Sequence, residues 1–256
     1  MEAQDQTDTS QPRRAARSSV AAILREAALE ALSPTRCAGC ERPGALICEE
    51  CLAAFTLIDP ALSCVNCGAP FGELLCTECR GEPGSCDRVL ACAAFDGPLP
   101  RIVRAYKDAG ERRLAAAIAE LMLDAAQHAE STAPDRYSGI LSGADAVAFV
   151  PATSEAYRRR GFDHMDAVAR ELCDLAGTPM LDCIVKHGRA DQRRLGREGR
   201  MDAAARMYEV AVDVRGLSLL LVDDVITTGA TMNAAASALR DAGAARVDAL
   251  ALARVW

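Results

Sequence analysis

Aromatic residues are scarce in this chain, which has one Trp, four Tyr and five Phe among 256 residues. Proteins that bind single-stranded nucleic acid usually stack bases on aromatic side chains, so the composition gives such binding weak support. The formal net charge of −7 also argues against a globally basic nucleic-acid-binding protein. Histidine is rare too, and the spacing of His128, His164 and His187 argues against a histidine metal site.

Long apolar runs are missing, so no transmembrane segment is predicted. No Gly-Lys-Ser or Gly-Lys-Thr occurs, which excludes a Walker A nucleotide loop. Residues 13–32 have apolar positions at helical spacing, but Arg25 and Glu26 interrupt them and no cleavage site follows, which argues against an export signal. We expect an amphipathic helix there, with association to a membrane surface as the open alternative. The chain is therefore expected to be cytoplasmic.

Cysteine, in contrast, is abundant, and eight of the twelve cysteines form four Cys-x-x-Cys pairs. The two halves of this region repeat one pattern, in which seven or eight residues separate two pairs. Such a spacing allows a hairpin to bring four thiolates around one tetrahedral Zn²⁺. The sequence therefore predicts two structural Cys₄ zinc sites, whose ligands are Cys37, Cys40, Cys48 and Cys51 in the first half and Cys64, Cys67, Cys76 and Cys79 in the second.

Two alternatives for these cysteines stay open. The first pair could share a metal with the third, and the second with the fourth, because spacing does not exclude a cross-braced arrangement. A disulfide framework would need an oxidising compartment, for which the sequence gives no sign. The remaining thiols lie singly in apolar stretches and are expected to be buried; they are Cys86, Cys92, Cys173 and Cys183.

From residue 88 onward, strand-like and helix-like segments alternate, which is typical of a parallel sheet flanked by helices. We expect a disordered N-terminus at 1–18, a helix plus double zinc ribbon at 19–82 and an α/β domain at 86–256. Strand patterns cover 88–95, 145–152, 181–185, 205–210, 217–222 and 247–255, and helix patterns cover 99–107, 112–129, 163–177 and 232–243.

The most informative segment is VDDVITTGAT, Val222–Thr231, which follows an apolar strand pattern. Asp223 and Asp224 fall at the carboxyl end of that strand, where open α/β sheets bind ligands. Adjacent carboxylates can accept hydrogen bonds from vicinal sugar hydroxyls or help to hold a divalent cation. The pattern therefore favours a sugar ligand at this edge of the sheet.

The residues after the acidic pair favour a phosphate group on that ligand. Thr227, Thr228 and Thr231 supply hydroxyl donors, and Gly229 permits close approach of the backbone. The helix that follows directs its free N–H groups at the loop, which makes an anion site. The alternative is an ordinary strand, turn and capped helix, with Thr228 as the cap and the aspartates solvated.

Three further segments are candidates for contact with this ligand. The turn Val150–Thr153 would place backbone amides at the same edge of the sheet, with a plain loop as the equal alternative. Arg158–Arg160 precede the expected helix at 163–177, where cations oppose the helix dipole unless an anion is present. Residues 186–200 carry six Lys and Arg against two acidic residues and form a candidate flap, with a solvated loop as the alternative. Lys107 is a weaker candidate for anion contact.

The order of apolar strand, acidic pair, two apolar residues and TTGxT resembles the phosphoribosyl pyrophosphate (PRPP) loop of type I phosphoribosyltransferases. The resemblance implies that the aspartates contact the ribose hydroxyls and that the threonine-rich loop cradles the 5′-phosphate. Mg²⁺ would accompany the pyrophosphate. The implied PRPP-binding residues are Asp223, Asp224, Val225, Thr227, Thr228, Gly229, Ala230 and Thr231, with Val150, Pro151 and Lys107 beside them.

Residues 37–256 as a whole resemble the ComF family of competence-associated, phosphoribosyltransferase-like proteins. The resemblance rests on the double cysteine repeat, AYKDAGERRLA, VPATSEAYRRRGFDH, Gln192–Arg200 and the VDDVITTGAT segment. Most members have VPVP and RGFNQ where this chain has VPAT and RGFDH. The implied fold is a type I phosphoribosyltransferase-like α/β domain with a small N-terminal zinc-ribbon module.

Two functions are compatible with this resemblance. An enzyme would transfer phosphoribosyl from PRPP to an unknown acceptor, with Asp223 and Asp224 orienting the ribose and Arg158, Arg160 or Arg194 neutralising the leaving pyrophosphate. A PRPP-sensing protein without catalysis would instead engage single-stranded DNA or competence proteins. Tyr157 and Phe162, which flank the arginines, would then be the best candidates for base stacking.

Overall fold

The computed structural model describes residues 34–70, 75–81, 84–187 and 207–256. The N-terminal segment at 1–18, the amphipathic helix expected at 13–32 and most of the flap expected at 186–200, with Arg194, lie outside the described residues. Within the described part of the chain, no helix has both the length and the apolar character that crossing a membrane requires.

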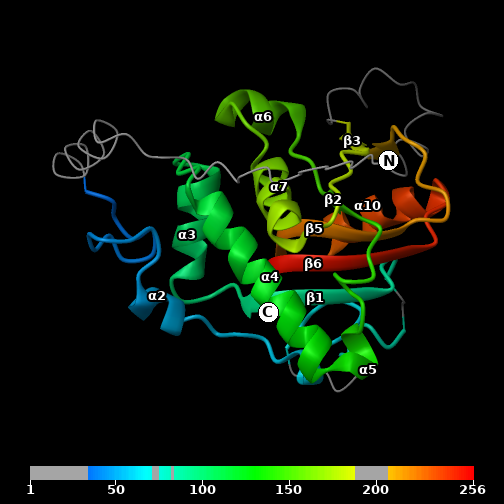
Figure 1. Ribbon diagram of the computed structural model, residues 1–256, viewed down its shortest axis with the longest axis horizontal. Coiled ribbons are helices and arrows are strands. Elements are labelled where there is room, and N and C mark those ends of the chain that lie inside the picture. The colour runs from blue at the N-terminus through cyan, green and yellow to red at the C-terminus, as the bar shows by residue number, and fades with distance from the viewer. Residues whose placement is uncertain (1–33, 71–74, 82–83, 188–206) are drawn as a thin grey trace, which may run out of the picture.

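Four parallel strands form the central sheet, in the order β1-β6-β5-β2. Because all four run in the same direction, their carboxyl ends meet at one edge, as the alternation of strand and helix patterns predicted (Figure 1). The expected parallel sheet flanked by helices is therefore confirmed. The strands are β1 (Arg88–Ala94), β2 (Ala146–Phe149), β5 (Ser218–Ile226) and β6 (Arg246–Arg254).

Helices cover both faces of this sheet, because side chains alternate between its two sides. Leu220 and Val222 of β5 belong to the core on one face of the sheet, which three helices cover. Leu219 and Leu221 belong to the core on the other face, which a single long helix covers. The same alternation directs Asp223 and Asp224 to opposite faces. The three helices are α3 (Leu99–Lys107), α4 (Leu114–Thr132) and α7 (His164–Ala176), and the single one is α10 (Ala230–Asp241) (Figure 1).

Two short strands do not join the central sheet. The patterns at 181–185 and 205–210 were expected to continue the parallel sheet, but β3 (Ile184–Lys186) and β4 (Tyr208–Val210) pair antiparallel with each other. Three residues per strand provide only a short ladder, and Tyr208 is buried in the core on the α10 side of the sheet. This pair therefore covers that face, and the expectation of two more parallel strands was wrong.

The cysteine-rich segment lies against the outer edge of β1. The amide of Ile58 donates to the carbonyl of Cys92 at 3.0 Å, and the amide of Val89 donates to the carbonyl of Val65 at 2.7 Å. These bonds occupy polar groups that an edge strand would otherwise expose. The segment contains α2 (Glu49–Ala53) and the short 3₁₀ helix η1 (Pro60–Leu62).

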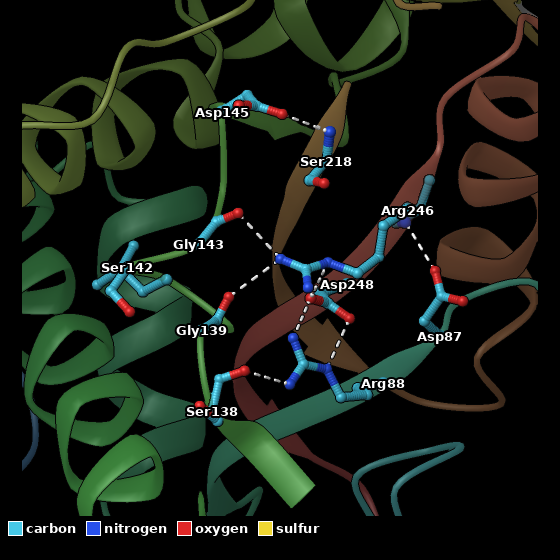
Figure 2. A network of polar contacts seen from close by, with 12 residues as sticks. Asp87, Arg88, Ser138, Gly139, Ser142, Gly143, Asp145, Ser218, Arg246 and Asp248 are labelled. Carbon is cyan, nitrogen blue, oxygen red and sulfur yellow. Dashed lines mark hydrogen bonds and ion pairs between the residues drawn. The ribbon is translucent and has the colours of Figure 1, made fainter. Parts of the chain in front are cut away.

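The amino ends of the strands are fixed by a network of ion pairs and hydrogen bonds (Figure 2). Asp248 of β6 is 1% exposed and accepts from Arg88 Nε at 2.9 Å, while Arg246 Nε lies 3.2 Å from it. Arg88 also donates to the carbonyl of Ser138 at 2.8 Å, and Arg246 donates to that of Gly143 at 3.0 Å. This edge is thereby closed by tightly held loops, and the opposite edge carries the candidate site.

Candidate functional site

The acidic pair lies near the carboxyl end of β5 and is buried. Asp223 is 8% exposed and Asp224 is 6% exposed, so the alternative of solvated aspartates is wrong. The amide of Asp224 donates to Asp223 Oδ1 at 2.9 Å, and the amide of Val225 donates to Asp224 Oδ1 at 2.8 Å. Each carboxylate is thus fixed by the strand backbone, and each faces a different side of the sheet.

A lysine and a histidine lie beside Asp224. Lys107, at the end of α3, forms an ion pair with it, and His164 Nε2, at the start of α7, lies 3.5 Å from its Oδ2 atom. Burial alone would raise the pKa of Asp224, but His164 and Lys107 together bring this pKa below its usual value. Tyr106 supports the arrangement, since its hydroxyl donates to the carbonyl of His164 at 2.5 Å.

Asp223 has a less favourable environment. Burial, with the neighbouring charge of Asp224, raises the pKa of Asp223 well above its usual value. On its side of the sheet lies Lys186 of β3, whose Nζ is 5.2 Å from the centre of the Tyr208 ring. Burial lowers the pKa of Lys186, and the charge of Asp223 opposes that effect. The negative charge of Asp224 is therefore stabilised by its neighbours, whereas the negative charge of Asp223 is disfavoured by its surroundings.

The loop Thr227–Thr231, for which the sequence predicts phosphate binding and which is called the phosphate loop below, leads from this pair into α10. Thr227, Thr228 and Thr231 are exposed, and Gly229, at φ +77°, adopts the left-handed conformation that favours glycine. Gly229 begins α10 without any side-chain cap of its own, while the hydroxyl of Thr228 accepts from the amide of Ala230 at a long 3.4 Å. The N-terminus of α10 therefore has backbone N–H groups that no N-cap side chain occupies and that face the loop, as an anion site requires.

The arginine cluster lies in a helix that the sequence analysis did not predict. Arg158–Arg160 form the last turn of α6 (Ser154–Arg160), which ends at Gly161 with φ +74°. Cations at the carboxyl end of a helix complement its dipole, so the expectation that these arginines oppose a dipole was wrong. Arg160 Nη1 lies 3.3 Å from His164 Nδ1, whereas Arg158 is exposed and donates to its own helix at Ser154. Of these two, Arg160 is the one that contacts the surroundings of the acidic pair.

The turn after β2 is occupied by internal hydrogen bonds. The amide of Val150 donates to the carbonyl of Val222 at 3.0 Å, and the amide of Ala152 donates to Asp163 Oδ2 at 2.7 Å. Pro151 has no amide hydrogen. Asp163 also caps α7 by accepting from the amide of Met165 at 2.9 Å. The backbone amides of 150–152 are thus committed to the fold, and Asp163 is a structural capping residue.

The paired cysteines form two separate clusters of four. In each, the four sulfur atoms lie within 4.8 Å of one another, and each cluster uses one half of the repeat. The cross-braced alternative is therefore wrong. All twelve cysteines are among the described residues and are free thiols, which also contradicts a disulfide framework. The first cysteine cluster is Cys37, Cys40, Cys48 and Cys51, and the second is Cys64, Cys67, Cys76 and Cys79.

Backbone amides donate hydrogen bonds to sulfur atoms of both clusters, which favours the thiolate form. The amide of Cys48 donates to Cys37 Sγ at 3.3 Å, and the amide of Cys76 donates to Cys64 Sγ at 3.2 Å. Burial opposes ionisation of Cys37, but amides, with that of Cys48 first, lower its pKa to about 6. Four close sulfurs with such support fit a tetrahedral metal ion of the zinc type. The four single cysteines are buried, as expected.

Two residues of the site, His164 and Arg254, carried no recognisable signal in the sequence, whereas Lys186 is the first residue of the flap expected at 186–200. His164 and Lys186 reach the acidic pair from segments remote from β5, and Arg254 reaches the phosphate loop from the end of β6. Phe162, expected to be free for stacking, packs edge-on against Tyr106 at 5.9 Å. Only the three-dimensional fold brings these groups together.

Known proteins share much of this chain. Residues 158–255, which include β5, the phosphate loop and α10, match the family described as the phosphoribosyl transferase domain. The DNA utilization protein YhgH of Salmonella typhi is 30% identical over 229 residues, which cover 86% of this chain and 97% of the relative. Competence protein F of Haemophilus influenzae is 26% identical over 198 residues, which cover 75% and 84%. A solved glutamine PRPP amidotransferase from B. subtilis aligns at 21% identity and a TM-score of 0.37, covering 55% of this chain and 26% of the other.

The two carboxylates should have opposite effects on stability. Asp223→Asn removes a charge that burial and Asp224 disfavour, so we expect its Tm at pH 7 to rise by about 3 °C, as for roughly 1 kcal/mol. Asp224→Asn leaves Lys107 and His164 without their common partner, so we expect its Tm to fall by about as much. Scanning calorimetry of the ligand-free proteins measures both shifts.

The pH dependence supplies the control. Because the pKa of Asp223 is raised in the folded protein, wild-type stability falls as the pH increases through the window between the unfolded and folded pKa values. The advantage of Asp223→Asn should therefore shrink as the pH is lowered from 8 to 5. Shifts of the same sign for both variants at pH 7 would contradict the assignment.

Proposed function

Because this chain belongs to the ComF family of phosphoribosyltransferase-like competence proteins, we propose that it binds PRPP with Mg²⁺ at the carboxyl edge of its sheet. One observation carries the proposal. Two buried carboxylates, Asp223 and Asp224, directly precede an exposed threonine-rich loop and a helix terminus without a side-chain cap of its own. Such a combination suits a ligand that has vicinal hydroxyls at one end and a phosphate at the other.

The 5′-phosphate would lie on the phosphate loop. The hydroxyls of Thr227, Thr228 and Thr231 are exposed, and Gly229 leaves room for the phosphate oxygens to approach the backbone. The first-turn amides of α10 would donate to the same oxygens, and the dipole of this helix favours negative charge there. Val225 and Ala230 would contribute through their backbone, as neighbours of these groups.

The ribose would lie over the acidic pair. Asp224, held ionised by Lys107 and His164, would accept hydrogen bonds from the ribose hydroxyls, and Asp223 would do so from its own side of the strand. The carboxylate oxygens also fit the hard oxygen ligands that Mg²⁺ prefers. When bound, Mg²⁺ would offset charge on the pyrophosphate, while Lys107 fixes the position of Asp224.

The reaction that this arrangement supports is phosphoribosyl transfer. An acceptor would form a bond to the anomeric carbon with inversion, and the bond from that carbon to pyrophosphate would break. Arg160, near His164 and Asp108, is the arginine of α6 best located to approach the leaving pyrophosphate. Arg158 would act only after leaving its bond to Ser154.

Each cysteine cluster would hold one structural Zn²⁺. The two metals would close the small hairpins of the N-terminal segment, which is too short to build a large apolar core of its own. We therefore assign residues 37–79 to a double zinc ribbon and 86–256 to the catalytic-type domain. Neither cluster lies at the carboxylates, so zinc would support structure here and not the transfer step.

PRPP binding is the direct test. Calorimetry with Mg²⁺ should detect binding by the wild type, and Asp223→Asn combined with Asp224→Asn should weaken it at least tenfold, because the ribose loses its acceptors (about 1.4 kcal/mol). The matched control is Asp213→Asn, an exposed carboxylate paired with Arg215, which should bind as the wild type does. Absent binding, or equal binding by all three proteins, would contradict the proposal.

A second candidate function is PRPP-dependent DNA binding without transfer. Two relatives carry names that refer to DNA utilization and competence, and Tyr157 is 52% exposed beside Arg158 on α6. Of the two stacking candidates, Phe162 is committed to Tyr106 and lies under Arg112 at 4.6 Å, so Tyr157 carries this candidate. Release of pyrophosphate in the presence of an acceptor separates the two functions.

Loss of the exposed ring should weaken DNA binding if this second function holds. For Tyr157→Ala we expect at least a fivefold loss of affinity for oligothymidine, consistent with about 1–3 kcal/mol for stacking on one base. For Arg158→Gln we expect a shallower dependence of affinity on salt concentration. Fluorescence anisotropy measures both, with Leu175→Ala, another exposed apolar residue, as the control. Unchanged affinity in both variants would place DNA binding elsewhere.

A further inference from the structure

Arg254, the last residue of β6, has a buried guanidinium without an acidic partner. The residue is 6% exposed, and no carboxylate in the described part of the chain lies within ion-pair distance of it. A buried charge is costly unless other groups compensate it. In Arg254 that compensation comes from backbone carbonyls, and their positions identify what the residue holds together.

These carbonyls belong to the second cysteine cluster and to the entrance of the phosphate loop. Arg254 Nε donates to the carbonyl of Cys67 at 3.0 Å, and its Nη1 donates to those of Ile226, at 3.4 Å, and Thr227. The carbonyl of Val255 accepts from the same nitrogen. One planar guanidinium therefore joins a predicted metal ligand to the first residue of the phosphate loop.

A second connection runs parallel to the first. The amide of Ser85 donates to Asn233 Oδ1 in the first turn of α10 at 2.9 Å, and the amide of Gly84 donates to Asn66 Oδ1 inside the second cysteine cluster at 2.7 Å. A Cβ atom at Gly84 would lie 2.9 Å from both side-chain oxygens, so a larger residue there would displace the two asparagine side chains from these positions. The cluster is thus connected to the phosphate loop through Arg254 and to α10 through Gly84 and Ser85.

Between these two connections lies a cavity of about 360 Å³, lined by Cys67 and Cys79 of the cluster, by Thr228 and Gly229 of the loop, and by Arg254. Because the space is open, close packing does not transmit a shift of the cluster to the loop here. Among the residues that the structure describes, the hydrogen bonds of Arg254 and Asn233 connect its two sides. A change at the cluster would therefore reach the loop mainly through these side chains.

We propose that Arg254 is a positioning residue that couples metal binding at the second cysteine cluster to anion binding at the phosphate loop. Metal fixes the Cys67 carbonyl, that carbonyl fixes the guanidinium, and the guanidinium holds Thr227 where its hydroxyl and the following amides face the ligand. The positive charge of Arg254, which pairs with no carboxylate among the described residues, also favours a phosphate on the adjacent loop. This inference rests on the proposed function, because the anion is taken to be the phosphate of PRPP.

Two single variants test the connection. Arg254→Met should keep about two zinc ions per chain by elemental analysis, as two closed Cys₄ sites require. In calorimetry with Mg²⁺ it should bind PRPP at least fivefold more weakly than the wild type. Arg254→Lys, which keeps the charge but cannot bridge the same carbonyls, should have an intermediate affinity. The matched control is Arg246→Met, on the same strand at the opposite edge, whose affinity should match the wild type.

A double-mutant cycle separates coupling from simple destabilisation. Cys76→Ser should lose the second zinc and weaken PRPP binding in the wild-type background, but add little in the Arg254→Met background. Additive losses, or wild-type affinity in Arg254→Met, would overturn the inference. If Arg254→Met does not fold, the same cycle is measured with Arg254→Lys. Additive losses of PRPP affinity in that cycle would likewise overturn the inference. A wild type that does not bind PRPP would instead refute the proposed function.

Discussion

Two adjacent carboxylates buried in one strand are the constraint on which the site depends. Because consecutive side chains alternate across a sheet, Asp223 and Asp224 have different neighbours, although the charge of Lys107 acts on both. On one face the end of α3 and the start of α7 supply Lys107 and His164. On the other, Lys186 of the small β3–β4 sheet lies nearby and Asp223 is the less compensated group. The ligand-free site thus holds negative charge ready for hydroxyl donors or a cation.

The sequence predicted the features that depend on local pattern. Apolar periodicity identified the strands of the parallel sheet, and the Cys-x-x-Cys spacing identified two clusters of four. It missed α6, because the run Arg158–Arg160 was interpreted as charge before a helix and not as the end of one. It also missed His164, and it included Lys186 only as part of the flap expected at 186–200, because the relation of both residues to the acidic pair depends on how distant elements pack. Short strands such as β3 and β4 have too few residues for their pattern to specify a partner.

The cysteine-rich segment contributes more than a separate module would. It covers the edge of β1 through backbone hydrogen bonds, and it contacts the loop end of β6 through Arg254. The amino ends of the strands are held by the network around Asp248. The carboxyl ends of the strands are therefore fixed by the sheet itself and by contacts with the cysteine-rich segment, while the phosphate loop stays exposed. A site built in this way combines fixed charges with an accessible helix terminus, as binding of a flexible anionic ligand requires.

The central claim is that the acidic pair and the phosphate loop bind one ligand together, and a crystal structure of the protein with PRPP and Mg²⁺ tests it most directly. The account predicts the 5′-phosphate against the amides that follow Gly229, with the ribose hydroxyls within hydrogen-bond distance of Asp223 and Asp224. Phosphate density on the arginines of α6, with the loop unoccupied and Asp224 still paired only with Lys107 and His164, would contradict it.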